Sequence, residues 1–206
     1  MKVLAVISQK GGAGKTTLAL HLAVAAELAG KTAAVIDLDP QASATGWKDN
    51  RRTETPAVVS AQAARLSHVL QAAKSNGASL AIIDTAPHSE SSALAAARAA
   101  DLILIPCRPA ILDLRAIGTT VDLAKLADRP ACIVLNAVPP RGSLADEAEA
   151  AVRSYQIPVA PQRIAHRAAY VHALTVGLAA QEYEPVGKAA QEITQLYMWT
   201  CTRVGL

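Results

Sequence analysis

Residues 10–17 read Lys10-Gly11-Gly12-Ala13-Gly14-Lys15-Thr16-Thr17, and they join the apolar run Val3–Ile7 to an alanine-rich segment that we expect to be a helix. Glycines let the backbone turn tightly and point its N–H groups inward around phosphate oxygens. The N-terminus of the following helix adds a positive dipole at the same point. A strand, a glycine-rich turn and a helix in this order predict a phosphate-binding loop.

The side chains of this loop predict which groups bind a nucleotide. Lys15 can reach the β- and γ-phosphates, and the Thr16 hydroxyl can ligate Mg²⁺. We therefore expect ATP and Mg²⁺ as cofactors. Gln9 stands where the usual loop pattern has its first glycine, and a second lysine, Lys10, follows it. The predicted nucleotide-binding residues of the loop are Gly11, Gly12, Ala13, Gly14, Lys15, Thr16 and Thr17.

The rest of the chain alternates short apolar runs with longer helical stretches, which predicts βαβ units and a mostly parallel sheet. We expect an α/β fold of the P-loop class, a twisted parallel sheet with helices on both faces, and a single domain over 1–206. The predicted strands are Val3–Ile7, Ala33–Ile36, Leu80–Ile83, Leu102–Ile105, Cys132–Leu135 and, more weakly, Ile157–Ala160. The predicted helices lie near 15–29, 58–75, 90–100, 111–127, 143–154 and 185–202.

Carboxylates follow two of these strands. Asp37 and Asp39 are two residues apart, so both can face the ligand edge of the sheet, where one would hold a Mg²⁺-bound water and the other would orient the attacking water. A helix cap or a turn before Pro40 is the alternative interpretation. Asp84 ends the next strand, where an aspartate can hold Mg²⁺ through water. We expect a single βαβ crossover between these two strands.

Asn136 ends the fifth predicted strand, where a side-chain amide can pair with the edge of an adenine; an ordinary turn before Pro139-Pro140 is the alternative. The polar segment Asp49–Pro56 predicts a mobile surface loop.

Several motifs together resemble the ParA/MinD family of P-loop ATPases, whose phosphate loop is a deviant Walker A motif. The matching motifs are K-G-G-x-G-K-[ST]-[ST] at 10–17, D-x-D-P-Q at 37–41, D-T-A-P at 84–87, the asparagine at 136 and a proline–arginine loop at 159–163. The resemblance is strongest to short ParA proteins of the ParF type. Because Met1 lies two residues before the first strand, we expect no preceding DNA-binding domain.

The resemblance implies roles for particular residues. Lys10 would reach across a dimer interface to the nucleotide of the partner subunit, Asp39 would serve hydrolysis together with Lys10 and Lys15, and the metal ligands would be Thr16, Asp37 and Asp84. It further implies an ATP-dependent homodimer that binds DNA nonspecifically and is stimulated by a ParB/ParG-like centromere-binding adaptor. The implied work is DNA partition by a cytoplasmic, nucleoid-associated ATPase. The candidate DNA contacts are Arg163, Arg167 and Lys188.

Composition is compatible with this picture and excludes some classes of protein. The formal net charge is +3, which permits contact with DNA without requiring it. Three cysteines without a CxxC spacing indicate neither a disulfide framework nor a zinc site and favour a reducing cytosol. No apolar run reaches the length of a membrane span, and no signal-peptide pattern precedes the first strand.

Three alternatives share the loop. A MinD-like membrane switch would need a basic amphipathic C-terminal helix, but Arg203 is the only basic residue over 196–206. A nitrogenase-reductase-like protein would hold an iron–sulfur cluster with two cysteines per subunit, with Cys107 as the candidate in a loop and Cys132 within a strand. A metabolic ligase or kinase would need an acid–base constellation, and His88 stands alone.

Overall fold

The computed structural model describes all residues from 1 to 206. Its centre is one sheet with the strand order β3-β2-β4-β1-β5-β6, in which every neighbouring pair is parallel. The predicted α/β class with a parallel sheet is confirmed. The strands are β1 (Lys2–Val6), β2 (Ala33–Asp37), β3 (Ala57–Ser60), β4 (Leu80–Asp84), β5 (Leu102–Cys107) and β6 (Ala131–Leu135).

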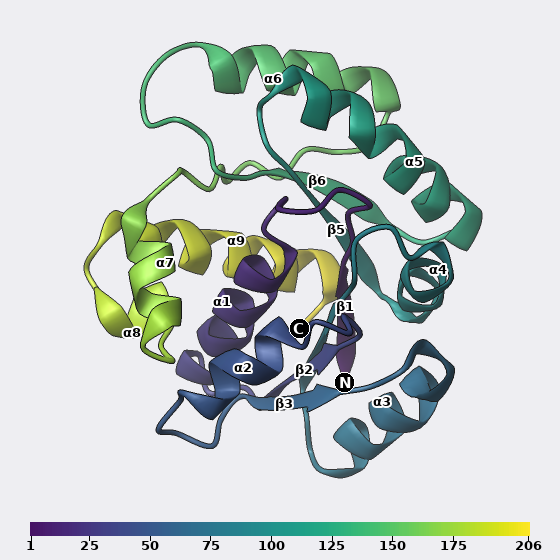
Figure 1. The fold of residues 1–206 in the computed structure, drawn as a ribbon, viewed down its shortest axis with the longest axis vertical. Helices are drawn as coiled ribbons and strands as arrows, with labels where there is room; N and C mark the ends of the chain where they lie inside the picture. The colour runs from purple at the N-terminus through teal and green to yellow at the C-terminus, as the bar shows by residue number, and fades with distance from the viewer.

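Helices cover both faces of the sheet (Figure 1). On one face lie α1 (Lys15–Leu28), α2 (Ser43–Asp49), α7 (Ala168–Thr175), α8 (Ala180–Tyr183) and α9 (Lys188–Val204). On the other face lie α3 (Leu66–Ser75), α4 (Glu90–Ala99), α5 (Ile111–Ala127) and α6 (Leu144–Val152). Short 3₁₀ turns, η1 (Ala63–Arg65) and η2 (Arg153–Tyr155), precede α3 and follow α6.

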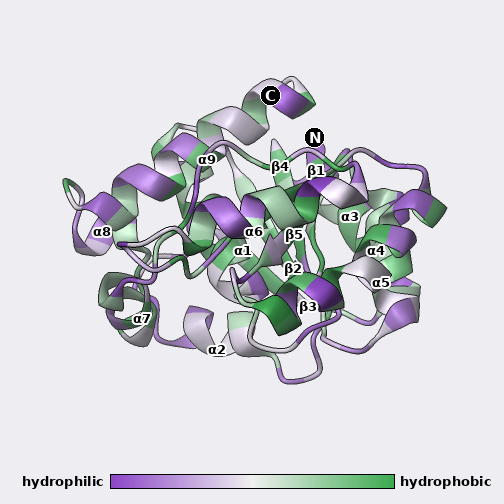
Figure 2. Ribbon diagram, turned by 90° about the horizontal axis from the view of Figure 1, so that it is seen from above, coloured by the Kyte–Doolittle hydropathy of each residue, from purple (hydrophilic) through white to green (hydrophobic).

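The continuous apolar runs follow from this two-sided cover. Along β1, Leu4 and Val6 pack into the core beneath α1 and α9, whereas Val3 and Ala5 pack into the core beneath α4 and α5. Successive side chains of a strand point to opposite faces, so a strand between two helical layers must be apolar at every position. In Figure 2 the strands are accordingly green, and the polar residues lie mainly towards the outside of the helices.

The predicted helix over 58–75 is wrong in its first residues. Residues Ala57–Ser60 form the edge strand β3, which pairs with β2, and the helix starts only at Leu66. The β-branched residues Val58 and Val59 suit this edge strand. The expectation of a single crossover between β2 and β4 is therefore also wrong, because α2, β3 and α3 all intervene between these neighbouring strands.

The weakly predicted strand Ile157–Ala160 is not a strand of the sheet. Only Val159 forms an isolated parallel bridge, with Ile133. Pro158 and Pro161 flank this position and have no N–H group to offer a ladder.

Segment 49–56 is anchored rather than free. The Arg51 guanidinium donates to both carboxylate oxygens of Glu182 over 2.8 and 2.7 Å, and its side chain is only 4% exposed. The Lys48 ammonium donates to the carbonyl oxygens of Thr53 and Glu54. Across the whole chain we find no helix with the length and apolar character that crossing a bilayer requires.

Candidate nucleotide site

The phosphate loop leaves β1 and enters α1, whose first residue is Lys15. Gly12 and Gly14 have φ values of +73° and +90°, a region that residues with a side chain avoid. A Cβ atom on Gly14 would also collide with the Asn136 side-chain amide. Gly14 is therefore required both by its backbone conformation and by this close contact.

Asn136 holds the loop from the carboxyl end of β6. Its Nδ2 donates to the Ala13 carbonyl oxygen over 2.7 Å, and its side chain is buried. Sequence reasoning missed this contact because the two residues lie 123 positions apart. The expected contact of Asn136 with adenine stays a prediction, whereas its contact with the loop is a structural fact.

Lys15 lies inside the loop, almost fully buried at 6% exposure. Its Nζ donates to the Lys10 carbonyl oxygen over 3.3 Å. Burial lowers the pKa of Lys15, and the nearby carboxylates of Asp84 and Asp39 oppose that effect. A partly desolvated ammonium group inside a phosphate loop suits a polyphosphate.

Asp84 is the residue that most clearly indicates a cation-binding site. It lies opposite Asp37 on β2 and Val6 on β1. It is fully buried, and neither carboxylate oxygen has a hydrogen-bond partner. Burial raises its pKa to about 7, with the Thr16 hydroxyl acting in the opposite direction. A buried, unpaired carboxylate is unfavourable, so the site fits a cation.

Magnesium matches this donor set. Mg²⁺ in nucleotide sites takes only one or two protein ligands, and waters and phosphate oxygens supply the others. Asp84 and the Thr16 hydroxyl are the residues that would hold it. No group of three or more His, Cys, Asp or Glu side chains in the chain forms a metal cage of its own, so the nucleotide phosphates would have to complete the coordination.

Asp37 is a cap in this structure, as the alternative interpretation suggested. One of its oxygens accepts from the Asp39 N–H over 3.0 Å, and the other accepts from the Ala44 N–H over 3.1 Å. Burial raises its pKa, and these backbone N–H donors oppose the rise. Asp37 thereby fixes the turn that carries Asp39 and the start of α2, and its role as a metal ligand stays a prediction.

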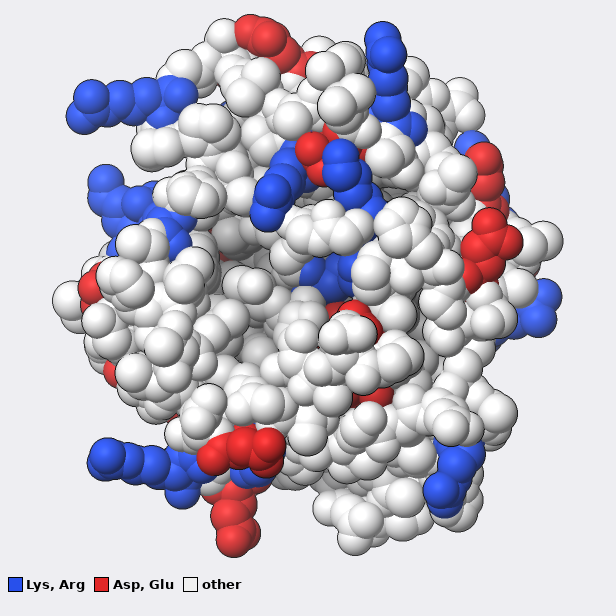
Figure 3. All heavy atoms as spheres, viewed as in Figure 1, with Lys and Arg blue, Asp and Glu red and all other residues white.

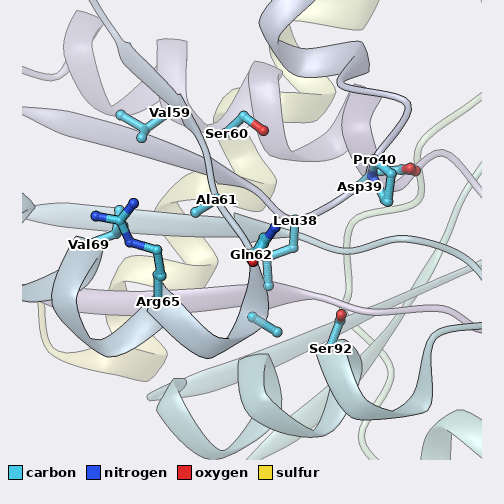
Figure 4. Close-up of a pocket in the computed structure, with 11 residues that line it drawn as sticks. Leu38, Asp39, Pro40, Val59, Ser60, Ala61, Gln62, Arg65, Val69 and Ser92 are labelled. Carbon is cyan, nitrogen blue, oxygen red and sulfur yellow. The ribbon is translucent and has the colours of Figure 1, made fainter.

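Asp39 is half-buried, and one of its oxygens accepts from the Gln41 N–H over 2.9 Å. It lies near enough to Lys15 to raise the pKa of that lysine. Asp39 also borders a cavity of about 650 Å³ (Figure 4). The lining residues of this cavity come from the loop after β2, from β3, η1, α3 and α4, and include Val59, Arg65 and Val69. Asp39 thus adjoins a hollow outside the phosphate loop, and its expected role in hydrolysis stays a prediction.

Lys10, the second lysine of the loop, is bound within its own chain. Its Nζ lies 3.2 Å from a carboxylate oxygen of Asp113 on α5, and its side chain remains 36% exposed. The expected reach of Lys10 to a partner subunit stays a prediction.

Two of the three candidate DNA contacts carry neutralised charges. Arg163 pairs with Asp146 and Glu149 over 2.7 Å each. Arg167 pairs with Glu192 over 2.5 Å, whereas Lys188 is exposed at the start of α9. In Figure 3 basic side chains gather near the middle of the drawn face with acidic ones among them. Because the charges of Arg163 and Arg167 are already paired, the structure gives no support to the prediction that these two arginines contact DNA.

Comparison with known proteins identifies the family. The model described as "CobQ/CobB/MinD/ParA nucleotide binding domain" matches residues 4–177. The chain belongs to this family. It is an ATPase, as its phosphate loop and its buried strand-end aspartate predict, and the description of the family names nucleotide binding.

One relative resembles almost the whole chain. It is the "Maintenance of carboxysome distribution protein A" of Gloeobacter kilaueensis, which is 36% identical over 93% of this chain and 88% of its own length. Among solved structures, the MinD cell division protein of Aquifex aeolicus has a TM-score of 0.81 at 17% identity and covers 98% of both chains. A complex of Cyanothece McdA with ATP has a TM-score of 0.74 at 19% identity over 100% of this chain and 97% of its own. At these identities the structures show the fold alone.

The expected closeness to ParF-type partition proteins is not supported. The sporulation protein Soj of Bacillus subtilis is 43% identical, but only over 21% of this chain. What is shown is membership of the ParA/MinD family, with the likeness over most of the chain to a carboxysome distribution protein.

Proposed function

We propose that this chain is an ATP-dependent positioning ATPase that distributes a large intracellular cargo over the nucleoid. Mg-ATP drives two chains into a homodimer, the dimer binds DNA without sequence preference, and an adaptor on the cargo stimulates hydrolysis and release. The observation that carries this proposal is the 36% identity, over 93% of the chain, to a carboxysome distribution protein. The motifs of the nucleotide site all follow the carboxyl ends of strands in the sheet, so they can act on one nucleotide, as such a cycle requires.

The cargo we propose is an intracellular body, for which the carboxysome in the relative's name is the example. A plasmid carried through a ParB/ParG-like adaptor is the second candidate, and it rests on the resemblance of the motifs at 10–17, 37–41 and 84–87 to ParA proteins. The two candidates share the same nucleotide cycle and differ only in what the adaptor binds.

The position of Lys10 supports a change of partner, from Asp113 of its own chain to the nucleotide of a second chain. Its ammonium group is partly exposed and pairs with Asp113 near the surface. Such a pair contributes only about 0–1 kcal/mol, since water screens it. A triphosphate presented by a second chain has more negative charge and more acceptor oxygens than one carboxylate, so it can displace Asp113.

A DNA-binding assay with ATP, ADP and no nucleotide tests the proposal. We expect co-sedimentation with DNA in ATP and little in the other two states. Lys15→Ala should lose nucleotide binding, whereas Lys10→Ala should keep it and fail to dimerise. Equal DNA binding in all three states would contradict the cycle, and dimerisation of Lys10→Ala on ATP would contradict the role of Lys10.

A MinD-like membrane switch is less well supported. Ile193, Leu196 and Tyr197 of α9 are buried in the core that α9 shares with α1. The apolar face of the last helix is therefore covered by the protein itself. Co-sedimentation with anionic liposomes in ATP would reveal the switch if it operates.

An iron–sulfur protein and a metabolic enzyme are also less well supported. Cys107 and Cys132 lie buried on neighbouring strands, and burial raises the pKa of each thiol to about 12. Thiols held protonated inside the sheet are poor ligands for a cluster shared between subunits. His88 is exposed in the loop after β4, which leaves the metabolic alternative without an acid–base pair.

A further inference from the structure

Arg108 brings a basic side chain to the phosphate loop from a neighbouring strand. It directly follows Cys107, the last residue of β5, and β5 lies next to β1 in the sheet. A Cβ atom placed on Gly12 would lie 3.7 Å from Nη2 and 4.0 Å from Cζ of Arg108. The guanidinium therefore lies beside the glycine turn, at the distance where a side chain on Gly12 would touch it.

The guanidinium of Arg108 has no carboxylate partner. No ion pair and no side-chain hydrogen bond forms from it, and the residue is exposed. The two lysines of the loop differ in this respect, because Lys10 pairs with Asp113 and Lys15 donates to the Lys10 carbonyl oxygen. Arg108 thus has all its donors available beside the loop.

The surroundings of Gly12 leave room for a ligand. A Cβ atom on the preceding residue, Gly11, would meet no atom within 4 Å, and both glycines are exposed. An arginine fork matches the geometry of phosphate oxygens and can bind two of them at once. In open α/β sheets the ligand lies beyond the carboxyl ends of the strands, where Arg108 stands.

We propose that Arg108 is a nucleotide-binding residue that contacts the phosphate chain held by the loop of its own protomer. It approaches the loop at Gly12, whereas Asn136, directly after β6, supports the same loop at Ala13. The contact belongs to nucleotide binding itself. It does not depend on the cargo, on DNA or on a second chain.

The test is a titration of the whole protein with a slowly hydrolysed fluorescent ATP analogue and Mg²⁺, at protein concentrations that keep it monomeric. Arg108→Gln removes the charge and Arg108→Lys keeps it without the fork. Arg115→Gln is the matched control, since Arg115 is an exposed arginine on α5 without an ion pair. Loss of a charge-assisted hydrogen bond corresponds to roughly tenfold weaker binding.

We expect Arg108→Gln to weaken analogue binding about tenfold, Arg108→Lys to weaken it less, and Arg115→Gln to leave it unchanged. The loss should shrink at high salt because the interaction is between charges. The melting temperature of nucleotide-free Arg108→Gln should equal that of the parent chain. If Arg108 instead stabilised the loop structurally, the variant would melt at a lower temperature. Affinity of Arg108→Gln within twofold of the parent chain would overturn the proposal, as would an equal loss in Arg115→Gln. Both results would leave the DNA-binding test of the positioning function intact.

Discussion

The ammonium nitrogen of Lys10 lies 3.2 Å from a carboxylate oxygen of Asp113 in the same chain. Lys10 belongs to the phosphate loop and Asp113 to the first turn of α5, so the pair joins two elements that meet at the carboxyl edge of the sheet. If Lys10 serves the nucleotide of a second chain, Asp113 competes with that nucleotide for the same charge. The ion pair would then set how readily the dimer forms.

Asp113→Asn should therefore promote ATP-dependent dimerisation. The gain should be up to about thirtyfold in the dimerisation constant, because each near-surface ion pair contributes about 0–1 kcal/mol and a symmetric dimer breaks two of them. Sedimentation velocity with ATP at several protein concentrations measures it. Asp122→Asn, an exposed aspartate on the same helix, is the control and should change nothing. Weaker dimerisation of Asp113→Asn would show that Asp113 assists the interface.

Asp84 should make the nucleotide-free protein less stable as the pH rises. Its pKa is about 7 in the folded chain against 3.8 ordinarily, so between these values the native state binds a proton that the unfolded state does not. Asp84→Asn should be the more stable protein at pH 8, by up to about 4 kcal/mol, and the gain should fade as the pH drops through 7 towards 4. Urea unfolding in EDTA between pH 5 and pH 8 measures the difference.

The comparison must be made between variant and parent at each pH. His21, whose pKa burial lowers to about 4, acts in the opposite sense and destabilises the native state as the pH falls below 6.5. Its effect is common to both proteins and cancels in the difference. A difference that does not vary with pH would mean that Asp84 is not protonated near neutrality. Asp84→Asn should also bind Mg-ATP more weakly, since it removes the negative charge that the cation needs.

Gly14→Ala should unfold or severely destabilise the loop. Its φ of +90° is strained for alanine, and the new methyl group would collide with the Asn136 amide. We expect a loss of at least about 2 kcal/mol in urea unfolding without nucleotide. Gly11→Ala is the matched control, because its φ is not positive and its methyl group would enter open space. Equal losses in the two variants would contradict this account.

Arg51→Met should destabilise the fold, although Arg51 lies far from the phosphate loop in the sequence. The Arg51 side chain is 4% exposed, pairs with Glu182 and stacks 4.8 Å from the Trp47 ring centroid. Removing it leaves a partly buried carboxylate unpaired, which costs about 2–4 kcal/mol. Arg52→Met, at an exposed neighbour, should stay within about 0.5 kcal/mol. Thermal unfolding of both variants gives the result, and similar melting temperatures would refute the anchoring role of Arg51.

Much of the fold could be predicted because its signals are local. The apolar runs of β1, β4, β5 and β6 are uninterrupted, and a strand between two helical layers has to be apolar at every position. The strand β3 and the short helices α2, α7 and α8 escaped prediction. An edge strand of four residues and helices of four to eight residues carry too little periodicity, and tertiary contacts select them.

By itself, the sequence determined the phosphate loop and the carboxylates at the strand ends, because a glycine turn and an aspartate after an apolar strand need only their immediate neighbours in the chain. The tertiary structure alone decided that Asn136 holds Ala13, that Asp37 caps α2, and that Asp113 and Glu182 engage Lys10 and Arg51. Contacts of this kind join residues from separate elements. Their geometry exists only after the sheet has brought its strand ends together and the helices have packed over its two faces.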